Sequence, residues 1–277
     1  SNRFYTYNTA TNMFNPISAN ENFEVAKGYL IRVPKNYSSY TPAVYEGNFI
    51  GKPNSGNIIF PMSSAGSGFN AVGNPYPSQI NVHNFIDANL DMDGTIYFWR
   101  KRNDMNETSY ATLNKNSYTR NGADGGDTGS SYYNSTSPVN WVINTGQGFI
   151  VKATDNANLV FTNGMRRGTN NSNQFFRMAK SAVVEPSQFK LNLTSTDGIF
   201  NQMALLYSPE YTLGYDRGYD SRNIASNNYI TSIIDGPSGG AFTIQSRPEF
   251  VSNDVVALEY KVSKSGSYTI TLDVFDG

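Results

Sequence analysis

Residues 267–275 read Ser-Tyr-Thr-Ile-Thr-Leu-Asp-Val-Phe, and this stretch decides the fold class. Large apolar side chains stand at every second position, namely Tyr268, Ile270, Leu272 and Val274. Alternation of apolar and polar residues with a period of two is typical of a β-strand that buries one face. The stretch therefore predicts a strand whose apolar face lies on a core.

Five more stretches in the last third of the chain predict strands separated by turn residues: 189–194, 202–207, 229–234, 241–245 and 255–262. This strand density is typical of an immunoglobulin-like sandwich. We therefore predict such a sandwich over residues 183–277, with a domain boundary near residues 178–186. The chain stops at the turn signal Asp276-Gly277, so we expect the closing strand to lie outside it.

Residues 1–180 predict a second β-rich domain, of the β-sandwich or jelly-roll type. Its expected strands are 28–33, 45–51, 57–60, 95–99, 148–152 and 159–162. The short turns between them predict that 45–51 pairs with 57–60, and that 148–152 pairs with 159–162. Residues 1–22 and 103–138 are rich in Asn, Ser, Thr and Gly and predict loops.

One short helix is predicted near residues 82–88. Asn81 is a favourable N-cap, and Val82, Phe85 and Ile86 share one helical face. The fold class is therefore all-β with a single short helix.

The amino-acid composition limits the kinds of function that the protein can have. Only 16% of the 277 residues are charged, and the polarity comes mainly from Asn, Ser, Thr, Gly and Tyr, which favours an extracellular β protein. There is no Cys and one histidine, His83, so disulfides, thiolate sites and multi-histidine zinc sites are excluded. A net charge of -1 argues against nucleic-acid binding. No apolar run is long enough to predict a transmembrane helix.

Several motifs stand in a definite order along the chain. They are Phe69–Ser78 with its Gly-Asn-Pro-Tyr-Pro core, Ile96–Trp99, the Gly-Gln-Gly-Phe motif of Gly146–Val151, Phe161–Arg166, Gly214–Asp216, Ile244–Arg247 and Gly266–Ile270. Together they resemble the C-terminal region of type IX secretion substrates of Bacteroidota, especially flavobacteria. In that resemblance, the last part of the chain is similar to an incomplete C-terminal sorting domain.

The resemblance implies a non-enzymatic portion of a secreted or cell-surface protein. It implies export across the outer membrane, with a type IX translocon or shuttle protein as the partner. A folded module would then present edge strands to that machinery.

The sequence also predicts a weak calcium site at Asp87, Asn89, Asp91 and Asp93, followed by Gly94. Oxygen ligands at alternate positions before a glycine turn suit this hard cation. The closing bidentate Glu of an EF-hand loop is missing, because Arg100 occupies the twelfth position of a loop that starts at Asn89. A polar turn between helix and strand is the alternative.

Two other functions remain open from the residues alone. A polysaccharide-binding or adhesin module in residues 1–180 is one, because aromatic faces stack on sugars and amides bind hydroxyls. Candidate aromatic residues for such binding are Tyr132 and Tyr133 within this range and Tyr211, Tyr215 and Tyr219 beyond it. The other is a glycoside hydrolase with a carboxylate pair, for which the sequence offers no recognisable spacing.

Overall fold

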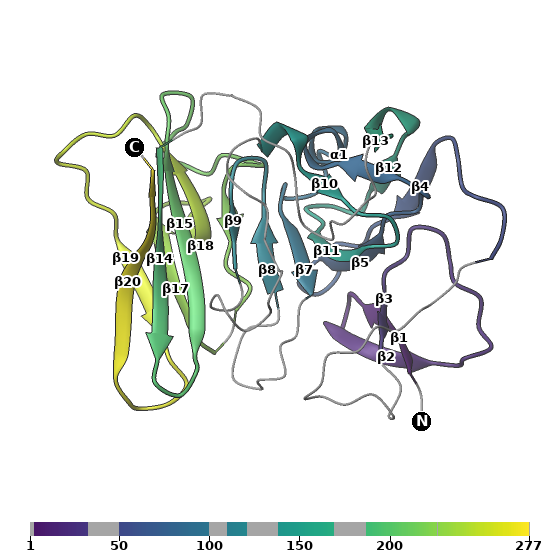
Figure 1. Ribbon diagram of the computed structural model, residues 1–277, viewed down its shortest axis with the longest axis horizontal. Coiled ribbons are helices and arrows are strands. Elements are labelled where there is room, and N and C mark those ends of the chain that lie inside the picture. Colours follow the sequence, from purple (N-terminus) through teal and green to yellow (C-terminus); the bar gives the residue numbers. More distant parts are fainter. Residues whose placement is uncertain are drawn as a thin grey trace. The chain divides into compact units, whose positions relative to one another are not determined.

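The structure is a computed structural model, and the residues that it describes are 3–32, 50–99, 110–120, 138–168, 187–225 and 227–276. It is mostly β, with one short α-helix among these residues and several antiparallel sheets (Figure 1). The chain divides into two compact units. Unit 1 comprises Ser1–Met92 and Val142–Asn171, and unit 2 comprises Asp93–Trp141 and Ser172–Gly277. The predicted boundary near residues 178–186 lies outside the described residues.

Unit 1 contains ten of the described strands and the helix. The elements are β1 (Phe4–Asn8), β2 (Met13–Ile17), β3 (Tyr29–Ile31), β4 (Ile58–Pro61), β5 (Phe69–Gly73), β6 (Gln79–Asn81), α1 (Val82–Ala88), β10 (Val142–Ile143), β11 (Gly148–Lys152), β12 (Asn158–Phe161), η2 (Asn163–Met165) and β13 (Arg166–Arg167). Small antiparallel groups link them, in the orders β2-β1-β3 and β10-β6-β13, with β5 beside β11 and β4 beside β12.

The predicted helix is confirmed by α1. The Asn81 side chain caps it by accepting a hydrogen bond from the Asn84 N–H at 2.9 Å. Val82, Phe85 and Ile86 are buried, as their spacing requires. Phe85 packs edge-to-face on Phe149 of β11, so the helix covers part of the core of unit 1.

Two predictions for unit 1 are wrong, and a third lies mostly outside the described residues. Residues 1–22 do not form a loop, because β1 and β2 make a hairpin there. Strands β11 and β12 exist as predicted, but β11 pairs with β5 and β12 pairs with β4, so the two do not pair with each other. Each of the two strands pairs with a strand that is distant in the sequence. A turn signal between neighbouring segments cannot specify such a pairing. The predicted strand 45–51 lies mostly outside the described residues, and β4 finds its described partner in β12.

Unit 2 contains the remaining described strands. They are β7 (Ile96–Trp99), β8 (Tyr110–Leu113), β9 (Tyr118–Thr119), β14 (Ser187–Ser195), β15 (Phe200–Tyr207), β16 (Ser221–Arg222), β17 (Tyr229–Ile234), β18 (Gly240–Arg247), β19 (Leu258–Lys261) and β20 (Tyr268–Asp276), with one 3-10 turn, η1 (Pro138–Asn140). Strands β8 and β9 fall in 103–138, so the prediction of a loop there is wrong for the described part.

The main sheet of unit 2 follows the order β19-β17-β18-β15-β14-β20, with β16 beside β18. All six strands predicted for the last third are present. Every pair is antiparallel except β15 with β18, which is parallel. Ile230 of β17 packs into one cluster with Leu193 of β14 and Leu205 of β15, although β18 and β15 lie between β17 and β14 in the sheet. These contacts show that the sheet is curled.

The sheet therefore has two unlike faces. The trough face is the concave one, which carries Leu193, Met203, Leu205, Tyr207 and Ile230. The packed face is the opposite one, which carries Lys190, Asn192 and Gln202 of β14 and β15. These three polar side chains are buried.

The alternation in β20 is interrupted once. Leu191 pairs with Leu272, whereas Lys190 pairs with Val274, so Asp273 is the extra residue of a β-bulge. A bulge re-aims one side chain out of the regular pleat. The prediction of unbroken alternation from Tyr268 to Val274 is therefore corrected at Asp273.

Candidate functional site

Of the predicted calcium ligands in unit 1, Asn89 uses its side chain for structural hydrogen bonds. The Asn89 amide donates to Phe85 O at 2.8 Å and to Val160 O at 3.0 Å, and its Oδ1 accepts the Val160 N–H at 2.6 Å. This side chain therefore joins the end of α1 to β12. Asp87 and Asp91 are exposed, and the Asp91 carbonyl accepts the Thr154 N–H at 2.8 Å.

Asp93 belongs to unit 2 and starts the turn into β7. Its Oδ1 accepts the Thr95 N–H at 3.0 Å, and Gly94 has a φ of 84°. A Cβ on Gly94 would lie 2.5 Å from Gly218 N, so only glycine fits there. Within the described ranges, no three His, Asp or Glu side chains gather as a metal site. The polar turn accounts for Asn89, Asp93 and Gly94, and calcium binding stays a prediction.

The tyrosines considered for sugar stacking take part in packing. Tyr211 is buried, its ring lies 5.2 Å from that of Tyr219, and its hydroxyl accepts a hydrogen bond from the Asn116 amide. The Tyr215 hydroxyl donates to Asp93 O at 2.6 Å. Their ring faces are therefore largely covered by unit 2 itself. Tyr132 and Tyr133 lie outside the described residues.

Unit 1 contains an open groove of about 740 Å³. Its walls come from the segment 23–31, the segment 50–54, the Pro75–Pro77 corner and the turn at Thr145–Gly146. Phe23 is 44% exposed in this lining and its ring lies 4.5 Å from that of Tyr29. The groove thus offers aromatic and apolar surface to a ligand.

The Gly-Asn-Pro-Tyr-Pro motif forms a rigid wall of this groove. The Asn74 amide donates to Ser78 O at 2.8 Å, while its Oδ1 accepts the Tyr76 N–H at 3.0 Å. The buried Tyr76 donates its hydroxyl to Gly56 O at 2.6 Å, and the Arg166 guanidinium lies 5.2 Å from its ring. These contacts hold residues 73–77 as a stiff corner that buries Tyr76.

The groove of unit 1 does not bring two carboxylates together. Glu24 is the acidic residue of the groove, and its carboxylate pairs with Lys27 at 2.6 Å. The Asp220 carboxylate is fully buried and accepts the N–H groups of Asp216 and Ser246, each at 2.6 Å. Burial raises its pKa to about 7, although the two N–H donors oppose this. Asp220 therefore holds loops in place in unit 2.

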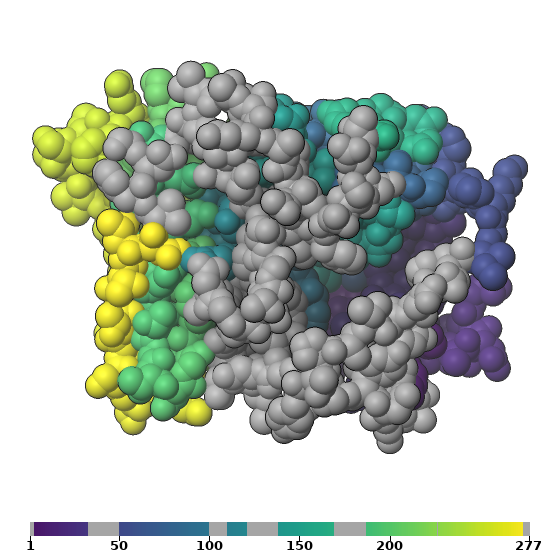
Figure 2. Space-filling model, in the orientation of Figure 1, coloured from purple at the N-terminus to yellow at the C-terminus, as the bar shows by residue number. Residues whose placement is uncertain are grey.

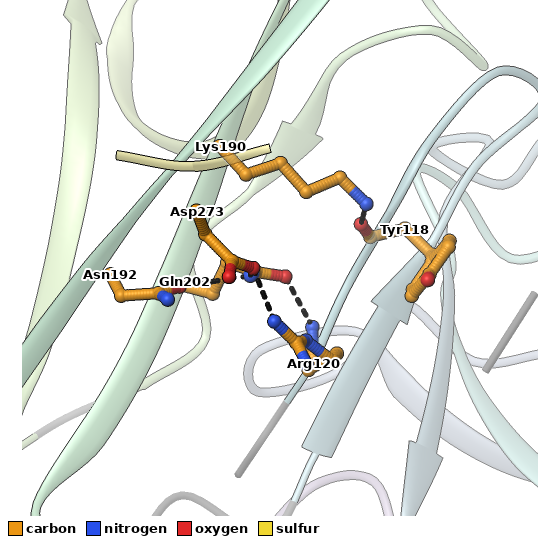
Figure 3. Close-up of polar contacts among 6 residues, drawn as sticks. All are labelled: Tyr118, Arg120, Lys190, Asn192, Gln202 and Asp273. Atoms are coloured by element: carbon orange, nitrogen blue, oxygen red, sulfur yellow. Dashed lines mark hydrogen bonds and ion pairs between the residues drawn. The ribbon is translucent and has the colours of Figure 1, made fainter. Parts of the chain in front are cut away.

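A polar cluster lies under β14 and β20 on the packed face of unit 2 (Figure 3). Gln202 is its hub, because its Nε2 donates to Asn192 Oδ1 at 2.9 Å and to Asp273 Oδ2 at 2.8 Å. Its Oε1 accepts the Arg120 N–H at 3.0 Å, and the Arg120 guanidinium forms an ion pair with Asp273. The bulge residue of β20 is thereby fixed to β15 and to the end of β9.

Lys190 completes this cluster from β14. Its side chain is buried, and Nζ donates to Tyr118 O at 2.7 Å while lying 3.7 Å from the Tyr118 ring centre. Burial, and then the nearby charge of Arg120, lower the pKa of Lys190 to about 7, whereas Asp273 opposes the shift. The amine is thus balanced between its neutral and charged forms near physiological pH.

The trough face is covered only in part. Leu272 of β20 is 57% exposed and Tyr260 of β19 is 61% exposed, and Leu258 and Ile270 are exposed beside them. Figure 2 shows β20 (yellow) at the surface beside β14 (green). Exposed apolar surface of this extent commonly marks a binding surface.

The polar cluster was not foreseen from the sequence. Its members come from β9, β14, β15 and β20, with up to 153 residues between Arg120 and Asp273. One signal was available, because Lys190 and Asn192 alternate with Phe189 and Leu191 in a strand of a core sheet. That signal leaves open which face is buried.

The trough, the groove and the polar cluster are the candidate sites of this chain. No curated protein and no solved structure matches it. Among the described residues, no helix has the length and apolar character that crossing a membrane requires. One family model covers residues 1–277, and the chain belongs to this family, described as "Domain of unknown function (DUF8693)".

Proposed function

We propose that the chain is a non-enzymatic portion of a protein that the type IX secretion machinery exports across the outer membrane. The mature protein is secreted or held at the cell surface, and residues 183–277 belong to an immunoglobulin-like sorting module. The partner is the outer-membrane translocon or its shuttle protein. The order of the sequence motifs supports the family of partners, and the trough face supports the mode of recognition.

The observation that carries the proposal is the unpaired state of two edge strands beside an apolar surface. Within the described residues, no strand pairs with the outer edge of β19 or β20. Soluble proteins usually protect such edges, because exposed N–H and C=O groups invite pairing with another chain. Residues 268–272 of β20 contain no proline and no charge. An edge of this kind suits recognition by strand addition.

The test uses the native protein in its own host. An epitope tag placed upstream of residue 1 reports the location of the protein in the wild type and in a strain that lacks the type IX translocon. We expect tagged protein at the surface or in the medium of the wild type, and retention in the periplasm of the mutant strain. Equal surface display in both strains would contradict the proposal.

A second candidate function is carbohydrate binding in unit 1, and the groove favours it. Phe23 presents an exposed ring at the groove, beside Tyr29 and the polar side chains of Lys52 and Asn54. Aromatic faces stack on sugar rings while amines and amides bind hydroxyl groups. An adhesin that holds a surface polysaccharide would use such a groove.

A glycan array probed with the whole chain tests this second function. We expect binding to at least one polysaccharide class, with a loss of at least ten-fold for Phe23→Ala. Phe250→Ala is the matched control, because Phe250 is also an exposed phenylalanine but belongs to unit 2. A flat array, or equal losses for the two variants, would remove the hypothesis.

A further inference from the structure

We propose that the trough of unit 2 binds one β-strand donated by a partner protein, and that this strand inserts between β19 and β20. The donated segment is extended and carries large apolar side chains at alternate positions. The inference deepens the proposed function by naming the binding surface, and it rests on that function only for the identity of the partner.

The topology leaves the outer edges of β19 and β20 unpaired among the described residues. Strands β19 and β20 are the two outermost strands of the curled sheet, yet residues 262–267 join them directly in the chain (Figure 1). The connection therefore keeps the end of β19 and the start of β20 within the reach of six residues of each other. Val262, the first residue of the connection, and Tyr268, the first residue of β20, pack against the trough cluster. Further along the two strands, Tyr260 and Leu272 are exposed, so burial decreases away from the joint.

Both edges present apolar side chains to the same space. Tyr260 pairs with Ile230, a member of the trough cluster, and Leu272 pairs with Leu191, which packs against that cluster. Directly opposite residues of paired strands share a face. The charged residues Glu259 and Lys261 occupy the alternate positions of β19, and so they lie on the other face. An occupant therefore meets an uncharged apolar surface from both sides.

The segment 248–257 borders the trough at the end away from the joint. Arg247 holds it through two hydrogen bonds to Asp254, of 2.9 Å and 2.6 Å, and Tyr207 donates to the same carboxylate at 2.9 Å. Val256 packs into the trough, whereas Val255 is 85% exposed. The hydrogen bonds to Asp254 thus hold the segment 248–257 in place at the border of the trough. The exposed Val255 extends the apolar surface onto this segment.

The experiment measures binding of labelled nine-residue peptides to the whole chain by fluorescence anisotropy. One peptide has the sequence of residues 267–275, and two others have Val-Thr or Ile-Ser alternation. The control peptide has proline in place of the leucine that corresponds to Leu272. We expect saturable binding of the alternating peptides and at least ten-fold weaker binding of the proline peptide. No saturation by any alternating peptide up to 1 mM would overturn the proposal.

Two variants and one matched control locate the site. Leu272→Lys and Leu258→Lys place a charge on the trough face of each edge and should each weaken binding at least ten-fold. Thr269→Lys, on the same strand as Leu272 but at an alternate position, is the matched control and should bind like the wild type. Circular dichroism confirms that each variant is folded. Full binding by both leucine variants would overturn the proposal.

A covalently appended copy of the segment gives an independent readout. The chain extended at its C-terminus by a short linker and residues 267–275 should fill its own trough, block peptide binding and protect β19 and β20 from hydrogen exchange. Unchanged peptide binding would contradict the inference. The outcome is separable from the proposed function, because peptide binding without translocon-dependent export assigns the trough to a different partner.

Discussion

The two faces of the main sheet in unit 2 differ in the polarity of their side chains and in how far these are buried. On the packed face, the polar side chains of Lys190, Asn192 and Gln202 are buried. On the trough face, apolar side chains such as Leu272 remain exposed. Most antiparallel sheets bury the apolar face and expose the polar one. The partial inversion at β14 and β20 indicates that unit 2 encloses polar groups for which it has partners, and leaves open an apolar surface that needs one.

Replacing Lys190 with methionine should have the largest effect on this contrast. The wild type keeps an amine buried at a site that lowers its pKa from 10.5 to about 7. That shift corresponds to at most about 5 kcal/mol. Lys190→Met should raise the free energy of unfolding by up to this amount below pH 7, measured by urea denaturation.

The pH dependence of the free energy of unfolding tests whether the pKa of Lys190 is lowered in the folded protein. Between pH 7 and 10.5 the unfolded chain binds the Lys190 proton while the folded chain releases it. The wild type therefore gains stability as the pH rises through this window. The advantage of Lys190→Met should shrink accordingly, whereas the exposed control Lys261→Met should show no such trend. A constant difference between Lys190→Met and wild type from pH 6 to 9 would contradict the assignment.

Leu193→Ala should produce the next largest effect. Leu193 lies on the trough face near the joint and is buried, so its truncation leaves a cavity. Losses of about 2–5 kcal/mol are typical for buried leucines. Thermal and urea unfolding would measure the loss, and a change below about 1 kcal/mol would show that this end of the trough is poorly packed.

Gln202→Leu tests the packed face. It keeps much of the side-chain volume but removes the hub that serves Asn192, Asp273 and the Arg120 N–H. Unsatisfied buried groups cost about 1–3 kcal/mol, so we expect a loss in this range, with faster hydrogen exchange in β20. A neutral result would mean that Asp273 keeps β20 in place without Gln202.

Leu272→Ala should have the smallest effect. It shares a face with Leu193, but its exposure means that truncation removes little buried surface. The change in the free energy of unfolding should stay within about 0.5 kcal/mol. A loss as large as that of Leu193→Ala would show that the trough is already filled in solution, which would break the comparison of the two faces.

Much of the secondary structure could be predicted from local patterns. The alternation in 268–272 predicted β20, and the spacing of Val82, Phe85 and Ile86 predicted α1. These signals work because each element satisfies its own backbone and shows its own period. Strand pairing failed where the partner is distant, as for β11 with β5.

The candidate sites were less accessible from sequence. The pattern of β14 does not reveal that Lys190 faces a buried cluster, because Tyr118 and Arg120 come from a region that predicted a loop. Similarly, the oxygen-rich residues at 87–93 suggested calcium, whereas Asn89 bonds to backbone groups of Phe85 and Val160. Amide and carboxylate side chains serve backbone caps as readily as ions.

The antiparallel pairing of β14 with β20 also determines how unit 2 responds to mechanical force. Gln188, near the start of β14, pairs with Asp276 at the end of β20, so a pull applied between these two points acts across one end of the pair. Its hydrogen bonds then break one after another, as in a zipper, and the strand peels away at low tension. Force applied at this end would therefore load the terminal hydrogen bonds of the β14–β20 pair first.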